Sequence, residues 1–95
     1  MKIAMVMDPK DNVATLLSDV EKGETVQVRL GEESREEKVG EPIQFGHKFA
    51  LKRIAKGENV VKYGEIIGRA TQDVDTGYHV HVHNVESLRG RGDKR

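Results

Sequence analysis

Three of the four histidines in this chain stand close together, at positions 79, 81 and 83 of the segment GYHVHVHNV, which runs from Gly77 to Val85. Valines separate them, and such alternation is typical of a β-strand with one apolar face, because successive side chains of a strand point to opposite sides. We expect Tyr78, Val80 and Val82 to enter a core. The three imidazoles would then share the opposite face, where their nitrogens can bind a metal ion or exchange protons.

The spacing of these histidines limits how many of them can bind one ion. Residues two apart on a strand lie about 6 to 7 Å from each other, and a metal–imidazole bond is about 2.1 Å long. Two neighbouring rings can converge on one ion, whereas three in a row cannot easily do so. If the segment is a metal site, a pair such as His81 and His83 would bind one ion, with its remaining ligands from elsewhere in the chain, and His79 would be structural. The alternative is an exposed or interface strand face on which the histidines only pack across strands, with Asn84 ending the strand.

The composition excludes several classes of site. The chain has 95 residues and no cysteine, so it contributes no disulfide, thiolate zinc site or iron–sulfur ligand. Sixteen basic residues balance sixteen acidic ones, and this zero net charge disfavours nucleic acid as a partner. A chain of this length forms one small domain, in which a deep catalytic cleft is not expected. Any metal site must therefore be built from histidine, carboxylate or water.

The first residues predict no targeting segment. Met1 to Met7 is apolar for only a few residues and is followed directly by Asp8 and Pro9. This stretch is too short for a signal peptide or a membrane span. We expect a cytoplasmic protein with no membrane partner.

Short apolar runs separated by glycine and proline predict a mainly β chain. The expected strands are residues 2–7, 25–30, 35–39, 45–51, 59–63, 65–71 and 77–85. The third of them is rich in charged residues, which is typical of an edge strand that must not pair with other molecules. The pattern predicts one domain of many short strands.

One short helix is expected between the first two strands. Its apolar residues recur at i, i+3, i+4 and i+7, the spacing of one helix face. These residues are Val13, Leu16, Leu17 and Val20. Asp11 is the expected N-cap of this helix, which would continue through Asp19 and end before Gly23.

One local pattern occurs three times: an apolar residue, two residues that are polar except for Ala55, a glycine and the start of a strand. The copies begin at Val20, Ile54 and Val74, and the intervals of 34 and 20 residues exclude a solenoid of fixed period. We expect a reused turn in which the apolar residue is buried and the glycine adopts a positive φ. Tyr63 and Gly64 are expected to form another tight turn with a packed ring; the alternative is a tyrosine acid paired with the carboxylate of Glu65.

Several runs carry a family resemblance. GHKFAL from Gly46, KYGEIIG from Lys62 and HVHVHN from His79 occur in this order, after the opening run DNVA from Asp11. These runs resemble the SAF domain at the N-terminus of altronate dehydratase. The resemblance covers nearly the whole chain.

The resemblance implies a β-clip (SAF-like) fold of short bent strands in residues 1–85, followed by a polar tail or tether in residues 86–95. It also implies a role in a hydro-lyase that removes water from a sugar acid such as altronate, with iron(II) or manganese(II). The expected partners are that substrate and a large catalytic dehydratase-like subunit. Independent catalysis by this chain is not expected.

The chemistry of such a lyase suggests roles for individual residues. Removing the proton α to a carboxylate leaves an enediolate, whose charge a cation stabilises while an acid assists the departing hydroxyl. On this resemblance His81 and His83 would bind the ion, and His47 would be a further ligand or the acid/base. Lys48 and Lys62 would pair with the substrate carboxylate, or else are solvated strand residues.

Two alternatives remain open at this point. The chain is also similar to the small subunit of sulfolactate sulfo-lyase, which eliminates sulfite instead of water. The second alternative is a non-catalytic module that binds a carbohydrate or serves only for assembly.

Overall fold

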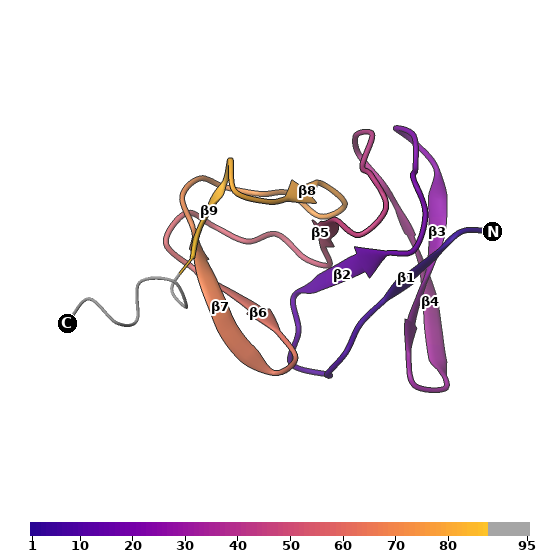
Figure 1. Cartoon of the computed structure of the whole chain (residues 1–95), viewed down its shortest axis with the longest axis horizontal. Coiled ribbons are helices and arrows are strands. Elements are labelled where there is room, and N and C mark those ends of the chain that lie inside the picture. Colours follow the sequence, from indigo (N-terminus) through magenta and orange to yellow (C-terminus); the bar gives the residue numbers. More distant parts are fainter. Residues whose placement is uncertain (88–95) are drawn as a thin grey trace.

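The computed structural model of the chain describes residues 1–87 and contains nine strands in two sheets (Figure 1). The strands are β1 (Ile3–Met5), β2 (Val13–Leu16), β3 (Thr25–Leu30), β4 (Glu33–Lys38), β5 (Lys48–Ala50), β6 (Asn59–Lys62), β7 (Glu65–Ala70), β8 (His79–Val80) and β9 (Val85–Ser87). The prediction of a mainly β, SAF-like fold of short strands is confirmed. The strands predicted at 25–30, 59–63 and 65–71 agree with β3, β6 and β7 to within one residue.

The larger sheet has the order β4-β3-β1-β2-β5-β8, and the smaller one has the order β6-β7-β9. In the larger sheet β1 pairs parallel with β3, and all other neighbours pair antiparallel. Figure 1 shows the β3–β4 hairpin at one end of the molecule and the β6–β7 hairpin at the other, with β2 and β5 between them. The β5–β8 pairing brings residues near position 80 beside residues near position 48.

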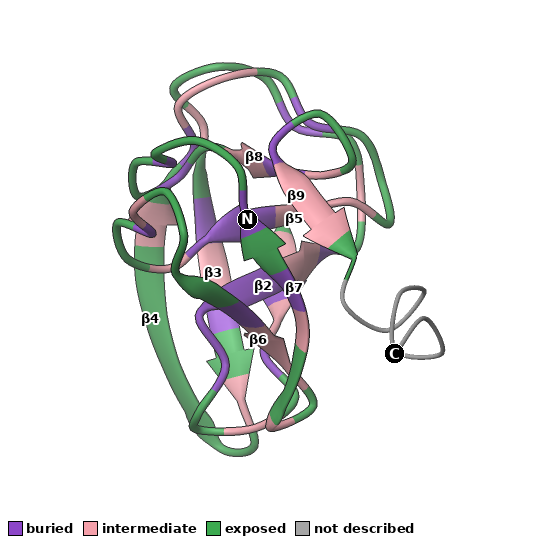
Figure 2. Cartoon of the chain, turned by 90° about the vertical axis from the view of Figure 1, so that its left-hand side faces the viewer, coloured by how far each residue is buried: buried purple, intermediate pink, exposed green. Residues whose placement is uncertain are grey.

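Two clusters of buried apolar side chains form the core. Fully buried members of the first include Leu16, Val26 and Phe49, and those of the second include Val13, Ile54 and Val80. Figure 2 shows β2 largely buried and β4 largely exposed. The charge-rich β4 lies at the edge of the larger sheet, where charged side chains discourage pairing with another molecule.

Residues 11–19 form no helix, so that prediction is wrong. Val13 to Leu16 form β2, a central strand that pairs with β1 on one side and β5 on the other. Val13 and Ala14 are adjacent and both buried, and burial on both faces removes the alternation that identifies a strand in a sequence. Leu17, expected on the apolar face of the helix, is 48% exposed.

Asp11 does not cap a helix; its carboxylate ties the segment after β1 to the β6–β7 turn. Oδ2 of Asp11 accepts hydrogen bonds from the backbone N–H groups of Met7 and Asp8. The same oxygen accepts from the N–H of Tyr63, and Oδ1 accepts from the N–H of Gly64 at 2.8 Å. The Asp11 side chain is nearly buried, so its carboxylate, and not water, satisfies these four backbone N–H groups.

Asn12 continues this connection. Its Oδ1 accepts a hydrogen bond from the N–H of Val61 at 2.8 Å, and its Nδ2 donates to the carbonyl of Asn59 at 2.9 Å. The side-chain amide thus bonds two backbone positions of β6 at once. Asp11 and Asn12 together attach the smaller sheet to the larger one through buried polar groups.

The recurring turn is confirmed, and the structure contains a fourth copy. Each copy has a buried apolar residue followed three positions later by a glycine with φ of 86 to 90°. The pairs are Val20 with Gly23, Ile43 with Gly46, Ile54 with Gly57, and Val74 with Gly77. The residue after each glycine donates a backbone hydrogen bond to the carbonyl three residues earlier, as in a type II turn. The copy at Ile43 was missed because Phe45 stands where the other copies have a polar residue.

The expected tight turn at Tyr63 and Gly64 is confirmed. These residues have φ of 58° and 72° and connect Lys62 to its partner Glu65, which is the two-residue hairpin that favours glycine. Tyr63 is 58% exposed as a residue, so the expectation of a packed ring is wrong. The ammonium of Lys62 lies 5.0 Å from the ring centroid, a cation–π distance.

The last described strand enters the region predicted to be a tail. Glu86 and Ser87 belong to β9 and pair with β7. The rest of the predicted tail, residues 88–95, lies outside the described residues. Within residues 1–87 there is no helix of the length and apolar character needed to cross a membrane.

Candidate functional site

The histidine-rich segment does not continue as one strand to Val85, so that expectation is wrong. β8 contains only His79 and Val80. His81 to Asn84 form a turn, which is closed by a hydrogen bond of 3.0 Å from the N–H of Asn84 to the carbonyl of His81. The chain reverses there because β9 must run back to pair with β7 in the other sheet.

This turn decides which apolar residues of the segment are buried. Val80 is buried, as expected. Val82 lies in the turn and is 81% exposed, so its predicted place in the core is wrong. Tyr78 is 41% exposed, and its ring lies against the backbone of Gly40.

The register between β5 and β8 places His47 beside the histidine-rich segment. Phe49 pairs with His79 and Lys48 pairs with Val80, so the next position of the same antiparallel register sets His47 opposite His81. The ring centroids of His47 and His81 are 4.3 Å apart. Residues directly opposite each other in a sheet are close enough for this contact.

Three imidazoles converge at this point, and we call His47, His79 and His81 the histidine cluster. One ring nitrogen from each of them lies within 4.8 Å of the others, and all three residues are half-buried. The shortest contact joins Nδ1 of His47 to Nε2 of His79 at 2.8 Å. The structure therefore groups His81 with His47 and His79, the residue expected to be structural.

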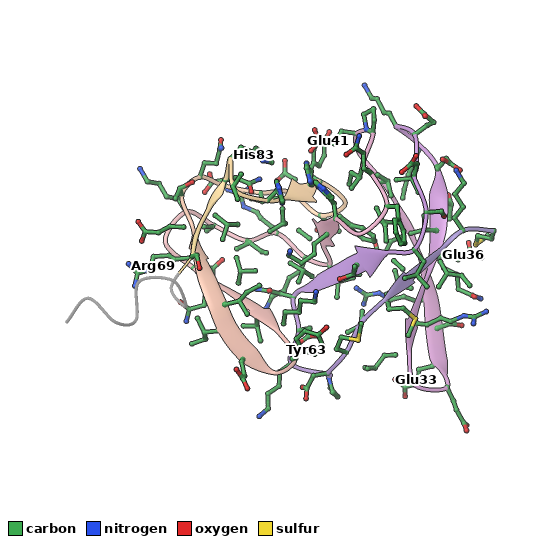
Figure 3. All side chains as sticks on the ribbon, viewed as in Figure 1. Glu33, Glu36, Glu41, Tyr63, Arg69 and His83 are labelled. Atoms are coloured by element: carbon green, nitrogen blue, oxygen red, sulfur yellow. The ribbon has the colours of Figure 1, made fainter. Side chains whose placement is uncertain are left out.

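His83 lies outside the histidine cluster. Its side chain is exposed, and its ring centroid is 5.1 Å from that of His79. Figure 3 shows His83 and Glu41 on the same edge of the molecule, with Tyr63 on the opposite edge. The sequence spacing suggested that His81 and His83 bind one ion together. That prediction assumed a straight strand, whereas both residues lie in a turn.

The geometry of the histidine cluster fits a divalent metal ion. Metal–imidazole bonds of about 2.1 Å place neighbouring ligand nitrogens about 3 Å apart, close to the separation of His47 and His79. Three imidazoles also leave coordination positions for water or a substrate. Such a nitrogen donor set suits iron(II) better than manganese(II), which prefers oxygen.

The electrostatic environment of His79 and His81 favours the neutral form of their rings, which is the form that can bind a metal ion. Burial lowers the pKa of His79, and the neighbouring His47, His83 and His81 lower it further, against an opposing effect of Glu41. Burial also lowers the pKa of His81, and His47, Lys48 and His83 add to this. Both rings are therefore neutral over a wider pH range than a free imidazole.

Two further side chains, Glu41 and Asn84, hold the backbone of this site, and neither was predicted to do so. Glu41 accepts a hydrogen bond from the backbone N–H of His79 at 2.9 Å. Asn84 is buried and bonds the backbone of both His79 and His81. Asn84 could have been found from its type and place, because asparagine favours turns that its side chain closes. Nothing in the sequence near Glu41 indicates its contact, which spans 38 residues.

Lys48 and Lys62 line one cavity of about 390 Å³ that also reaches His81. Most of its remaining lining is apolar: Val60, Ile67, Val80, Val82 and Val85. Burial lowers the pKa of Lys48, and the positive charge of Lys62 lowers it further. We call this space the lysine cavity; its two amines repel each other unless an anion lies between them.

A larger cavity of about 700 Å³ lies between the β3–β4 hairpin and the segment around Lys10 and Asn12. It touches none of the four histidines. Size alone does not make a site, and we place the candidate site at the histidine cluster because titratable groups converge there.

Comparison with known proteins agrees with the resemblance seen in the sequence. Residues 2–88 match the family described as the altronate/galactarate dehydratase SAF domain. Altronate dehydratase of Bacillus subtilis is 40% identical over 87 residues, which are 92% of this chain and 17% of that protein. Altronate dehydratase of Escherichia coli is 44% identical over 77 residues, or 81% of this chain and 15% of that protein.

A smaller relative matches over almost its whole length. The (2R)-sulfolactate sulfo-lyase subunit alpha of Chromohalobacter salexigens is 36% identical over 88 residues, covering 90% of this chain and 94% of that protein. The chain thus spans less than a fifth of the altronate dehydratases but nearly all of the sulfo-lyase subunit. By its sequence, the chain belongs to the altronate/galactarate dehydratase SAF domain family.

Proposed function

We propose that this chain is the small subunit of a two-chain sugar-acid hydro-lyase resembling altronate dehydratase. In this proposal it contributes a substrate- and metal-binding rim to an active site that a larger, dehydratase-like catalytic subunit completes. The observation that carries the proposal is the convergence of His47, His79 and His81 beside a cavity with two lysines. We also propose that the protein is located in the cytoplasm.

The histidine cluster would hold the divalent ion, iron(II) in preference to manganese(II). If bound, such an ion would supply positive charge to stabilise the enediolate that forms when a base, which we assign to the larger subunit, takes the α-proton. His47 would then act as a ligand, since its Nδ1 is directed at His79. His83 is exposed beside His79 and remains free of the cluster, so it would donate the proton to the departing hydroxyl.

The lysine cavity would receive the carboxylate end of the sugar acid. Lys48 and Lys62 together supply two positive charges, and partial burial of Lys48 strengthens its attraction for an anion. His81 borders both the lysine cavity and the histidine cluster, so an acid bound by the lysines would lie next to the metal-binding nitrogens.

A larger partner is supported by the relatives. The altronate dehydratases are several times longer than the matched region, so most of each protein lies outside it. The relative matched over 94% of its length is itself a subunit by name. Both comparisons are consistent with a SAF domain that works together with a larger catalytic part.

A sulfo-lyase is the second candidate, and the nearly full-length match to a sulfo-lyase subunit alpha favours it. The same rim would bind the carboxylate and hydroxyl of sulfolactate, and the departing group would be sulfite instead of hydroxide. The two activities differ mainly in the contacts to the leaving group, which we assign to the larger subunit.

The test is to purify the chain together with a larger dehydratase-like subunit from the same cells and to assay altronate dehydration and sulfolactate cleavage. We expect one activity, a raised KM in Lys48→Met and a large loss of kcat in His81→Ala. Lys52→Ala, at a lysine that lines the larger cavity, is the matched control and should leave both constants unchanged. If the complex forms but neither His81→Ala nor Lys48→Met alters catalysis, the chain is an assembly module and the proposal is wrong.

A further inference from the structure

We infer that Asn84 is a positioning residue that sets the distance between His81 and the other two rings of the histidine cluster. This inference rests on the proposed function, because it assigns Asn84 to the metal-binding rim. Asn84 itself does not face the ligand nitrogens: its amide is directed at the backbone and is buried.

Three hydrogen bonds link Asn84 to the two histidines. Its Oδ1 accepts from the N–H of His81 at 2.9 Å, and its Nδ2 donates to the carbonyl of His79 at 2.7 Å. Its own N–H donates to the carbonyl of His81 at 3.0 Å. Both groups of the side-chain amide are therefore in use, and each holds a different histidine.

These bonds fix the backbone on both sides of Val80, from which the two rings project. The rings of His79 and His81 are stacked, with centroids 5.4 Å apart and planes within 9°, and the ring of His81 also lies 4.3 Å from that of His47. Without Asn84, nothing in the described residues fixes the N–H of His81, which lies just beyond the last pair of the β5–β8 ladder. His81 would then be free to move away from His47.

Groups that orient metal-binding histidines often contribute tenfold or more to metal affinity without touching the ion. Asn84 differs from the usual case because it orients the backbone instead of the second ring nitrogen. Its amide spans the carbonyl of His79 and the N–H of His81, so it acts on the separation of two ligands at once.

The chain offers a matched control for loss of a buried amide. Asn12 is as buried as Asn84, and its side chain also accepts from one backbone N–H and donates to one backbone carbonyl. Its partners are Val61 and Asn59, and neither belongs to the histidine cluster. Asn12→Ala and Asn84→Ala therefore remove equivalent bonds, but only the second acts on the histidines.

The first measurement needs no metal. In the full metal-free chain at pH 8, nuclear Overhauser effects between ring protons of His47 and His81 report their 4.3 Å contact. We expect Asn84→Ala to abolish these signals and Asn12→Ala to retain them. Asn84→Asp, which keeps the acceptor for His81 but not the donor for His79, should weaken them and provides a second variant if Asn84→Ala does not fold. Retention of the signals in a folded Asn84 variant would overturn the inference.

The second measurement is titration with Mn²⁺ or Fe²⁺ under anaerobic conditions. Asn84→Ala should weaken binding about tenfold or more, and Asn12→Ala should bind as the unaltered chain does. Equal binding by Asn84→Ala and the unaltered chain would also overturn the inference. If the unaltered chain binds neither ion, the assignment of the metal site to this chain alone fails, while the ring contacts still decide the role of Asn84.

Discussion

Nδ1 of His47 and Nε2 of His79 lie 2.8 Å apart, although the two residues are 32 positions apart in the sequence. At this distance one nitrogen must carry a hydrogen and the other must accept it, or an ion must lie between them. In the metal-free chain, one of the two rings therefore carries its hydrogen on the nitrogen that faces the other ring. An ion bound by both facing nitrogens would require that hydrogen to move to the other nitrogen of the same ring, so this hydrogen bond and ion binding exclude each other.

The histidine cluster predicts which histidines matter for metal binding. His47→Ala removes one of three converging ligands and should weaken Mn²⁺ binding by more than about tenfold, the loss typical of removing only a supporting contact. His83→Ala is the control, because His83 lies outside the cluster, and should bind nearly as well as the unaltered chain. Calorimetric titration measures both. An equal loss in the two variants would restore the pairing of His81 with His83 that the sequence suggested.

The lowered pKa values of His79 and His81 predict a stability that decreases in mild acid. Each ring has an ordinary pKa of 6.5, which is lower in the folded chain. The unfolded chain then binds more protons below about pH 6.5, so stability is fully present above that pH and falls as the pH drops through the folded pKa values. Urea unfolding of the metal-free chain at pH 7.5 and 5.5 should give the lower midpoint at pH 5.5.

The double variant His79→Gln with His81→Gln tests the source of that decrease. Its midpoint should fall less between the two pH values, because the two groups that resist protonation are gone. A decrease as large as that of the unaltered chain would assign the effect to other groups.

Asp11 predicts a large loss of stability from a single carboxylate. Asp11→Ala leaves four backbone N–H groups without their acceptor, and the free energy of unfolding should fall by about 3 kcal/mol or more. Asp75→Ala, which removes an exposed ion pair with Arg53, should change it by less than about 1 kcal/mol. Denaturant unfolding, fitted with one common m-value, compares the free energies of unfolding of the two variants. Similar losses in both variants would contradict the role of Asp11 in joining the sheets.

Gly77 and Gly57 occupy the same kind of turn, with φ of 88° and 90°, but differ in their surroundings. A methyl group at Gly57 would meet nothing within 4 Å, whereas one at Gly77 would clash with the carbonyl oxygen of Lys38. Gly57→Ala should cost only the positive φ, about 1 to 2 kcal/mol. Gly77→Ala should cost more and should disturb the signals of His79, because β8 begins two residues later. Equal losses of stability would show that the backbone around Lys38 gives way.

Local patterns predicted much of the fold. The alternation in TVQVRL gave the bounds of β3, and a glycine three residues after a buried apolar residue identified three of the four turns. β2 was mistaken for a helix because its burial depends on two neighbouring strands, one of them more than thirty residues away. A central strand with both faces covered carries no local signal that separates it from a helix.

The candidate site was predicted only in part for a similar reason. The spacing of the histidines identified the region, but their partner was set by the register of β5 on β8, which joins residues 32 positions apart. The turn at Asn84 then removed His83 from the group. If the segment is treated as one straight strand, neither the contact with His47 nor the separation of His83 can be predicted.

The short β8 makes the site depend on the order in which the chain assembles. β8 has only two residues and is joined to the sheet along one side, so a species in which it has not yet docked holds His47 alone. An ion that requires all three rings of the histidine cluster can bind only after β8 has paired with β5. If the proposed ion binds there, it would stabilise the docked form of β8, and removing the ion with a chelator would loosen β8 before the rest of the domain.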